Sequence, residues 1–191
     1  MIPPSAYVAA LAGFERMTTS RLATLLAGRS AEEAHAIAVG KRRAPEPIAA
    51  LLGRPPDPAA PRRNEPTPRP PADVWRTGRD TAVAVVVPGA VEYPPQLLDA
   101  PRRPAALVVR GDLGVLDGRR VGIVGTRNAT QRGRETAARF GYELADAGVV
   151  VVSGLARGID GSAHRGALAV AGSTPVAVVG NGPDVPYPKQ H

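Results

Sequence analysis

The sequence predicts an α/β protein with a Rossmann-like parallel sheet, preceded by a small all-α module. Short apolar runs recur in the second half of the chain, helical patterns separate them, and glycine-containing segments follow them. Strands that alternate with helices in this way pair in parallel through right-handed crossovers.

The first 52 residues predict the helical module. Ser30 and Glu33 have the spacing of a capping box ahead of an apolar stripe, and Gly40 ends that helix. A module of this size is marginal on its own, because a small domain buries only a modest share of its surface.

A proline-rich segment separates this module from the rest of the chain. Eight of the twenty residues 53–72 are proline, with arginines among them. Proline removes backbone donors and fixes φ, so the composition predicts an extended linker over 53–80. This linker could touch phosphates, but a solvated spacer is the preferred interpretation.

Residues 81–191 predict the α/β domain. The run Val83–Val87 is typical of a strand buried on both faces. Further strands are expected at Leu107–Val109, Val121–Val124, Val149–Val152 and Pro175–Val179. Thr130 or Asn128 can cap the first helix between them, and Asp160 can cap the second.

Three glycine-containing segments, 125–128, 153–158 and 180–182, each follow one of the last three strands. Ends of parallel strands meet at one sheet edge, where open α/β folds bind ligands. Free N–H groups at helix starts and two arginines predict an anion pocket there. The candidate phosphate-binding residues are Gly125, Thr126, Arg127, Ser153, Gly154, Arg157, Gly158, Gly180 and Gly182.

The same loops argue against a nucleotide cofactor and against hydrolysis. Arg127 stands where the dinucleotide fingerprint places its second glycine. The second strand ends in Val152-Ser153, with no acidic residue there to hold a ribose hydroxyl. Ser153, Asp160 and His164 resemble a triad in composition, but the nucleophile elbow is missing. The sequence therefore predicts no catalytic residue, no metal site and no cofactor.

Composition limits the setting and the partners. The net charge is +7 and the pI about 10.7, which fits a polyanionic partner or a solvated basic surface. No cysteine is present, and no apolar run approaches the roughly 20 residues of a membrane span. We therefore expect a soluble, cytoplasmic protein without a membrane partner.

In order and spacing, several of these runs resemble the DNA-processing protein A family (DprA, also called Smf). The run from Ser153 to His164 is the most specific, and the helical segment 5–40 looks like the N-terminal module of that family. The runs that carry the resemblance are Tyr93–Leu98, Leu107–Gly111, Val121–Arg127, Val152–Asp160, Ala163-His164, Ala167-Leu168 and Tyr187-Pro188.

The resemblance implies a non-enzymatic protein that binds and protects single-stranded DNA during natural transformation and loads a RecA-type recombinase. It implies a Rossmann domain that usually dimerises and a pocket gripping phosphates through the first two loops. It also implies a chain truncated within that domain, which would leave its last strand as an open edge. Two alternatives stay open: a pocket that binds or hydrolyses a small nucleotide, and a remnant that cannot fold.

Overall fold

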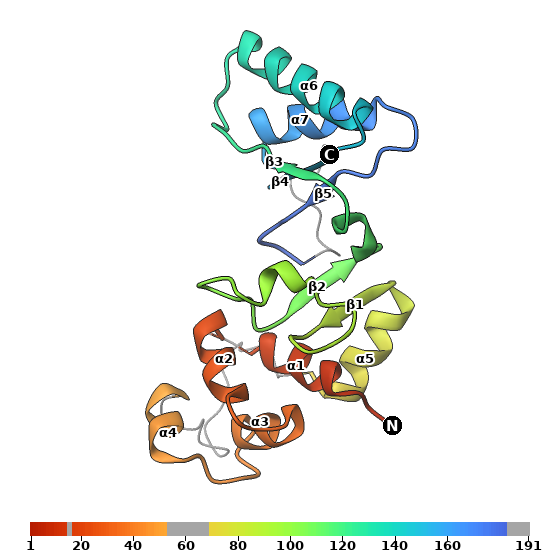
Figure 1. Cartoon of the computed structure of the whole chain (residues 1–191). Helices are drawn as coiled ribbons and strands as arrows, with labels where there is room; N and C mark the ends of the chain where they lie inside the picture. The colour runs from red at the N-terminus through yellow and green to blue at the C-terminus, as the bar shows by residue number, and fades with distance from the viewer. Residues whose placement is uncertain (15–16, 53–68, 183–191) are drawn as a thin grey trace. The chain divides into compact units, whose positions relative to one another are not determined.

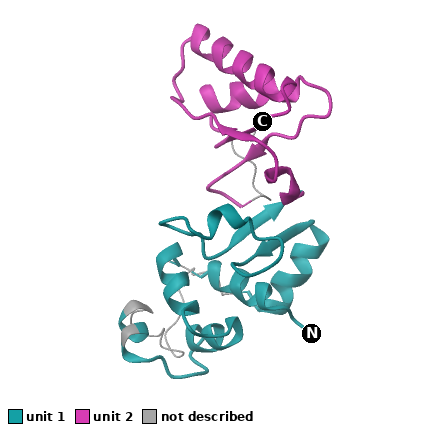
Figure 2. Cartoon of the chain, in the orientation of Figure 1, with its two compact units in different colours: residues 1–111 teal, residues 112–191 magenta. Residues whose placement is uncertain are grey.

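The computed structural model describes residues 1–14, 17–52 and 69–182. The chain forms two compact units, residues 1–111 and residues 112–191 (Figure 2). These units do not coincide with the three regions expected from composition, because residues 81–111 pack with the N-terminal helices. Each unit is described by itself.

Unit 1 begins with a group of short helices (Figure 1). They are α1 (Pro4–Ala12), α2 (Thr19–Leu26), α3 (Ala31–Ala38), α4 (Glu46–Leu52) and α5 (Pro71–Asp80). The capping box at the start of α3 is confirmed, with Ser30 Oγ accepting from the Glu33 N–H at 3.1 Å. The core of this unit consists mainly of Val8, Leu11, Leu22, Leu25, Ala34, Ile37 and Ile48.

Helix α5 occupies part of the segment that composition assigned to the linker. It begins directly after Pro70 with Pro71 in its first turn, where proline loses no intrahelical hydrogen bond. The prolines therefore mark the start of a helix here rather than continuing an extended spacer. Residues 53–68 of the expected linker lie outside the described residues.

Strands β1 (Val83–Val86) and β2 (Leu107–Arg110) form an antiparallel pair, in which Val83 faces Arg110. The expectation of a β1 strand buried on both faces was wrong, since Ala84 is exposed and only Val86 is fully buried. The connection between the strands holds only the short 3-10 helix η1 (Pro95–Leu97) and no crossover α-helix. A chain that returns without a crossover pairs antiparallel.

Tyr93 lies in this connection and is 3% exposed. Its hydroxyl donates to the Pro104 carbonyl at 3.0 Å, and burial raises the pKa of the phenol. Tyr93 therefore packs the loop that connects β1 and β2. Tyr187, the other Tyr-Pro position, lies outside the described residues.

Unit 2 is the parallel α/β arrangement that the sequence predicts. After the 3-10 helix η2 (Leu113–Leu116) come β3 (Arg120–Gly122), α6 (Gln131–Asp146), β4 (Val150–Ser153), α7 (Ile159–Leu168) and β5 (Val176–Ala177). The strand order is β3-β4-β5, and both pairings are parallel. Thr130 caps α6 by accepting from the Gly133 N–H at 3.1 Å.

Both helices of unit 2 lie on the same side of the sheet and pack against each other (Figure 1). Val151, Ala163 and Ala167 form the buried centre of this layer. Among the described strands, β3 and β5 each pair with one neighbour, so they are the edge strands of this part of the sheet. None of the described helices is long and apolar enough to cross a membrane.

Candidate phosphate-binding site

The loops that leave β3 and β4 touch each other at the carboxyl edge of the sheet. The Ile159 N–H donates to the Thr126 carbonyl at 3.3 Å. Gly158 has φ +91°, and a Cβ at this position would overlap the carbonyl oxygens of Thr126 and Arg127. Only glycine permits both this backbone conformation and this close approach. The predicted meeting of the two loops is therefore found in the structure.

A single carboxylate joins the two loops. Asp160 Oδ1 accepts from the Gly125 N–H at 3.0 Å, and Oδ2 accepts from the Gly154 N–H at 3.1 Å. The side chain is buried, with 5% of its surface exposed. Hydrogen bonds from peptide N–H groups to a carboxylate are among the stronger ones in proteins.

The expectation that Asp160 caps α7 was wrong. The N-cap is Gly158, and Asp160 is the second residue of the helix. Its carboxylate bonds to the ends of two strands rather than to its own helix, although a negative charge in the first turn still favours the helix dipole. Sequence reasoning missed this role because one of the two partners lies 35 residues away along the chain.

The two hydrogen bonds of Asp160, to Gly125 and Gly154, form a clamp between the loops. The clamp determines which N–H groups remain available to a ligand. Those of Gly125 and Gly154 already bond to Asp160. The Gly161 N–H is also used, since it donates to the Ala156 carbonyl at 2.8 Å. The N–H groups of four other loop residues form no hydrogen bond with any described residue, namely Thr126, Arg127, Arg157 and Gly158.

Both predicted arginines, Arg127 and Arg157, have exposed side chains. The ion pairs found within the described ranges involve neither of them. Neither guanidinium is therefore paired with a carboxylate in this part of the chain. Guanidinium groups of this kind can bind phosphate with two parallel hydrogen bonds.

The other predicted positions differ in accessibility. The Ser153 side chain is 3% exposed and accepts from the Leu155 N–H at 3.4 Å, so it supports the loop from below. Thr126 Oγ1 accepts from the Asn128 N–H at 3.2 Å and fixes the first turn. Gly180 and Gly182 are exposed beyond the end of β5. All three loops thus contribute exposed positions to the candidate site, and Ser153 lies beneath them.

The combination of Ser153, Asp160 and His164 does not form a catalytic triad. Asp160 directs both oxygens to peptide N–H groups, and His164 is buried with 5% of its surface exposed. Within the described residues, no group of three or more histidines or carboxylates is arranged to hold a metal ion.

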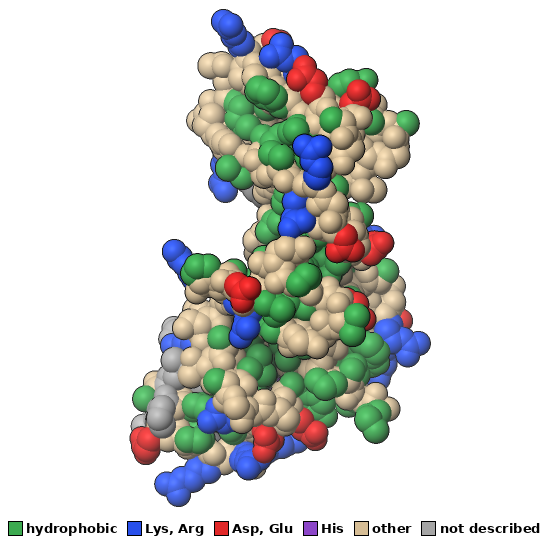
Figure 3. All heavy atoms as spheres, viewed as in Figure 1, with side chains coloured by type: hydrophobic (Ala, Val, Ile, Leu, Met, Phe, Trp, Pro, Cys, Tyr) green, Lys and Arg blue, Asp and Glu red, His purple; other side chains and the backbone are tan. Residues whose placement is uncertain are grey.

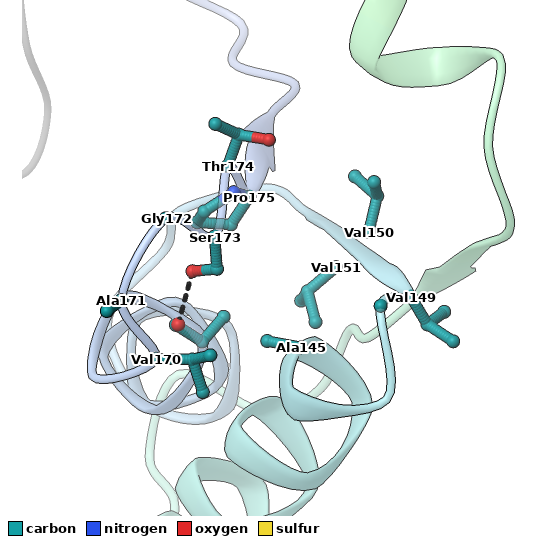
Figure 4. Close-up of a pocket in the computed structure, with 12 residues that line it drawn as sticks. Ala145, Val149, Val150, Val151, Val170, Ala171, Gly172, Ser173, Thr174 and Pro175 are labelled. Atoms are coloured by element: carbon teal, nitrogen blue, oxygen red, sulfur yellow. Dashed lines mark hydrogen bonds between the residues drawn. The ribbon is translucent and has the colours of Figure 1, made fainter.

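A hollow of about 230 Å³ lies at the opposite, amino edge of the sheet (Figure 4). Alanine, valine, glycine, serine, threonine and proline line it, among them Ala145, Val151 and Ser173. It contains neither a charged nor an aromatic side chain, so it offers nothing to grip a phosphate or stack on a base.

Basic side chains are not confined to the two loops. On the face drawn in Figure 3, basic side chains lie at separate places over both units, among apolar and acidic side chains. This face therefore carries no continuous basic surface.

Comparison with known proteins identifies the family. Residues 84–191 match the family model described as DNA recombination-mediator protein A. The chain belongs to this family. The match confirms the DprA/Smf resemblance seen in the sequence, and it includes every residue of the candidate site.

Two relatives place the match in context. Protein Smf of Escherichia coli K12 is 44% identical over 99 residues, which cover 52% of this chain and 26% of that protein. DNA processing protein DprA of Bacillus subtilis 168 is 35% identical over 114 residues, covering 59% and 38% respectively. The chain thus spans well under half the length of either relative.

The fold resembles that of a solved family structure. The X-ray structure of DprA from Streptococcus pneumoniae aligns with the whole of this chain and with 62% of its own, with a TM-score of 0.61 and 24% sequence identity. This likeness supports the α/β fold that the sequence predicts.

Proposed function

We propose that the carboxyl edge of the β3–β5 sheet binds single-stranded DNA through its phosphates. One observation carries the proposal: two touching glycine loops each present an exposed arginine and N–H groups that no described residue occupies. Phosphate is the ligand that combines best with guanidinium and peptide N–H donors. Such a site would hold the DNA backbone with little reading of base sequence.

We also propose that the protein protects the strand in natural transformation and transfers it to a RecA-type recombinase. The family description as a recombination mediator supports this role. We propose that it acts without catalysis, which is consistent with the occupation of both Asp160 oxygens by peptide N–H groups. The resemblance also supports a homodimer, which the sedimentation velocity of the protein would test.

Fluorescence anisotropy of a labelled oligothymidylate over a salt series tests the DNA proposal. Arg127→Ala and Arg157→Ala should each weaken binding by about tenfold, the equivalent of one charge-assisted hydrogen bond. Each should also make the plot of log affinity against log salt shallower, because about one fewer phosphate is neutralised.

Arg139→Ala is the matched control. It removes the same charge from the exposed face of α6, where Arg139 pairs with Glu143 in the next turn, and it should leave the affinity nearly unchanged. Equal losses in all three variants would point to general basic charge instead of the two loops. Failure of a cooperatively folded wild-type chain to bind would reject the DNA proposal.

A small nucleotide is the second candidate ligand, because the available N–H groups are concentrated on two adjoining loops. Competition of thymidine monophosphate against the oligonucleotide separates the two. A site for a DNA strand should prefer the oligomer strongly, since consecutive phosphates add their contacts. Comparable affinity for monomer and oligomer would favour the nucleotide pocket.

Loading of recombinase is measured separately, by the DNA-dependent ATPase of a RecA-type protein on strands pre-coated with a single-strand-binding protein. The protein should shorten the lag, and its Arg127→Ala variant should do so less. An unchanged lag would reject the loading role without affecting DNA binding.

A further inference from the structure

We propose that Asp160 is a positioning residue that holds the two arginine loops at the spacing required for phosphates of one strand. This inference rests on the proposed function. It starts from the bidentate contact of Asp160 with Gly125 and Gly154, the points at which the chain leaves β3 and β4. No contact of Asp160 with the ligand is required.

The geometry makes the carboxylate specific. Asp160 is buried, and each oxygen accepts from one peptide N–H, so a residue with one acceptor can serve only one loop. A Cβ on Gly154 would lie 2.9 Å from Asp160 Oδ2. The space at Gly154 is therefore reserved for the carboxylate, and the two positions are sterically coupled.

The clamp acts at the base of both loops. Gly125 is two residues before Arg127, and Gly154 is three residues before Arg157. On the outer side, Gly158 packs against the carbonyls of Thr126 and Arg127. The loops are thus fixed at the base by a charge-assisted contact and farther out by backbone packing. Removing the base contact should change the spacing of the arginines while leaving the strands paired.

Asp160→Asn tests this role with almost no change in size. The amide keeps one acceptor and turns its NH₂ group toward the other peptide N–H, which frees one loop. We expect DNA affinity to fall by about tenfold, since one charge-assisted hydrogen bond is lost and one arginine is displaced. Salt dependence should become shallower as well, which a purely structural loss of folded protein would not cause.

A double-mutant comparison separates positioning from simple weakening. If Asp160 acts through the loops, Arg127→Ala or Arg157→Ala, whichever lies on the freed loop, should cost clearly less in the Asp160→Asn background than in the wild type. Arg139→Ala should cost the same in both backgrounds. Strict additivity of Asp160→Asn with both Arg127→Ala and Arg157→Ala would overturn the inference and leave DNA binding by the arginines intact.

A second variant tests the clamp if Asp160→Asn does not fold. Gly154→Ala keeps the charge but pushes against Oδ2, so it should reproduce the loss of affinity and the shallower salt dependence. Wild-type affinity of a folded Gly154→Ala chain would count against the clamp.

Amide hydrogen exchange of the free protein gives a readout that does not depend on DNA. The Gly125 and Gly154 N–H groups should exchange slowly in the wild type, and at least one should exchange faster in Asp160→Asn. Unchanged exchange would overturn the clamp. A clamp seen by exchange in a wild-type chain that binds no DNA would instead remove the proposed function and, with it, the role of Asp160 in binding.

Discussion

The cores of the two units are built in opposite ways. In unit 1, large side chains fill the space between short helices, and Leu11 and Leu25 are completely buried. In unit 2, α6 and α7 approach until Gly141 of one faces the Ala163 carbonyl of the other. The core of unit 1 depends on large side chains that fill it. The core of unit 2 depends on small residues that let the two helix backbones touch.

This difference predicts opposite sensitivities to substitution. Removing methylene groups from a filled core leaves a cavity, so unit 1 should suffer most from smaller residues. Adding a methyl group between touching backbones forces the helices apart, so unit 2 should suffer most from larger ones. The Rossmann-like unit can thus carry a core of small residues because its helices lie so close together.

The largest effect is expected for Leu25→Ala in unit 1. Leu25 is 0% exposed, and loss of a buried leucine side chain costs roughly 2–5 kcal/mol. Trp75, the only tryptophan in the chain, lies on α5 in the same unit, so its fluorescence during urea unfolding should follow the loss.

Leu25→Met is the control, because it conserves volume at the same position and should cost less than about 1.5 kcal/mol. Ala10→Gly would not serve, because it changes helix propensity as well as volume. Equal losses for Leu25→Met and Leu25→Ala would contradict a core that depends on filled volume.

The next effect is expected for Gly166→Ala in unit 2. A Cβ at Gly166 would overlap the Ala138 carbonyl oxygen of α6. Overpacking of this kind costs about 1–3 kcal/mol, which exceeds the roughly 1 kcal/mol that alanine adds to helix propensity. Hydrogen exchange of the α6 and α7 amides should be faster as a result.

Gly118→Ala serves as the control in the same unit. Its Cβ would meet nothing within 4 Å, and its φ lies outside the left-handed range. We expect no loss of stability, or a gain of a few tenths of a kcal/mol from the stiffer unfolded chain. A Gly166→Ala chain as stable as Gly118→Ala would show that the helices have room to spare.

The same comparison explains what the sequence could predict. The alternation of strands and helices in unit 2 is written in local patterns, so the parallel sheet and the Thr130 cap could be predicted. The antiparallel pairing of Val83–Val86 could not, because an apolar run does not specify its partner strand. Helix α5 was not predicted, because the prolines around its start indicate an extended linker.

The candidate site could likewise be predicted only where local patterns specify it. The glycine loops and their arginines could be placed at one sheet edge from strand order alone. The clamp could not, because a local cap explains an aspartate at a helix start just as well as a contact with a distant loop does. The family match includes Asp160 but says nothing of its hydrogen bonds.

Smaller effects, similar in the two units, are expected when a helix cap is removed. Ser30→Ala removes the hydroxyl that accepts from the Glu33 N–H at the start of α3, an eight-residue helix, and should cost about 1 kcal/mol. The backbone N–H of residue 30 can still donate to the Glu33 carboxylate. Thr130→Ala removes a similar cap from the sixteen-residue helix α6 and should cost about the same. Trp75 fluorescence reports the first variant and amide exchange the second. A loss confined to unit 2 would mean that the helices of unit 1 do not depend on their caps.

The smallest effect concerns pH and is confined to unit 1. Burial, together with nearby Lys41, lowers the pKa of His35, which packs edge-on against Tyr7 at 5.7 Å and against Phe14. The unfolded chain takes up a proton near the ordinary histidine pKa of about 6.5, whereas the folded chain does so only at lower pH. Unit 1 should therefore lose stability as the pH falls below about 6.5, until the folded histidine is protonated too.

His35→Phe should remove this pH dependence, because phenylalanine keeps an aromatic contact and has no proton to gain. Urea unfolding followed by Trp75 fluorescence between about pH 8 and pH 5 measures the pH dependence of stability. This range lies above the titration of Glu33, because the pKa of that carboxyl is lowered. Unit 2, followed by amide exchange corrected for the intrinsic effect of pH, should not share the His35-dependent loss. If the stability of the wild type and of His35→Phe depended on pH in the same way, the aromatic contacts would not hinder protonation of the imidazole. The core of unit 1 would then be packed less tightly around His35 than around Leu25.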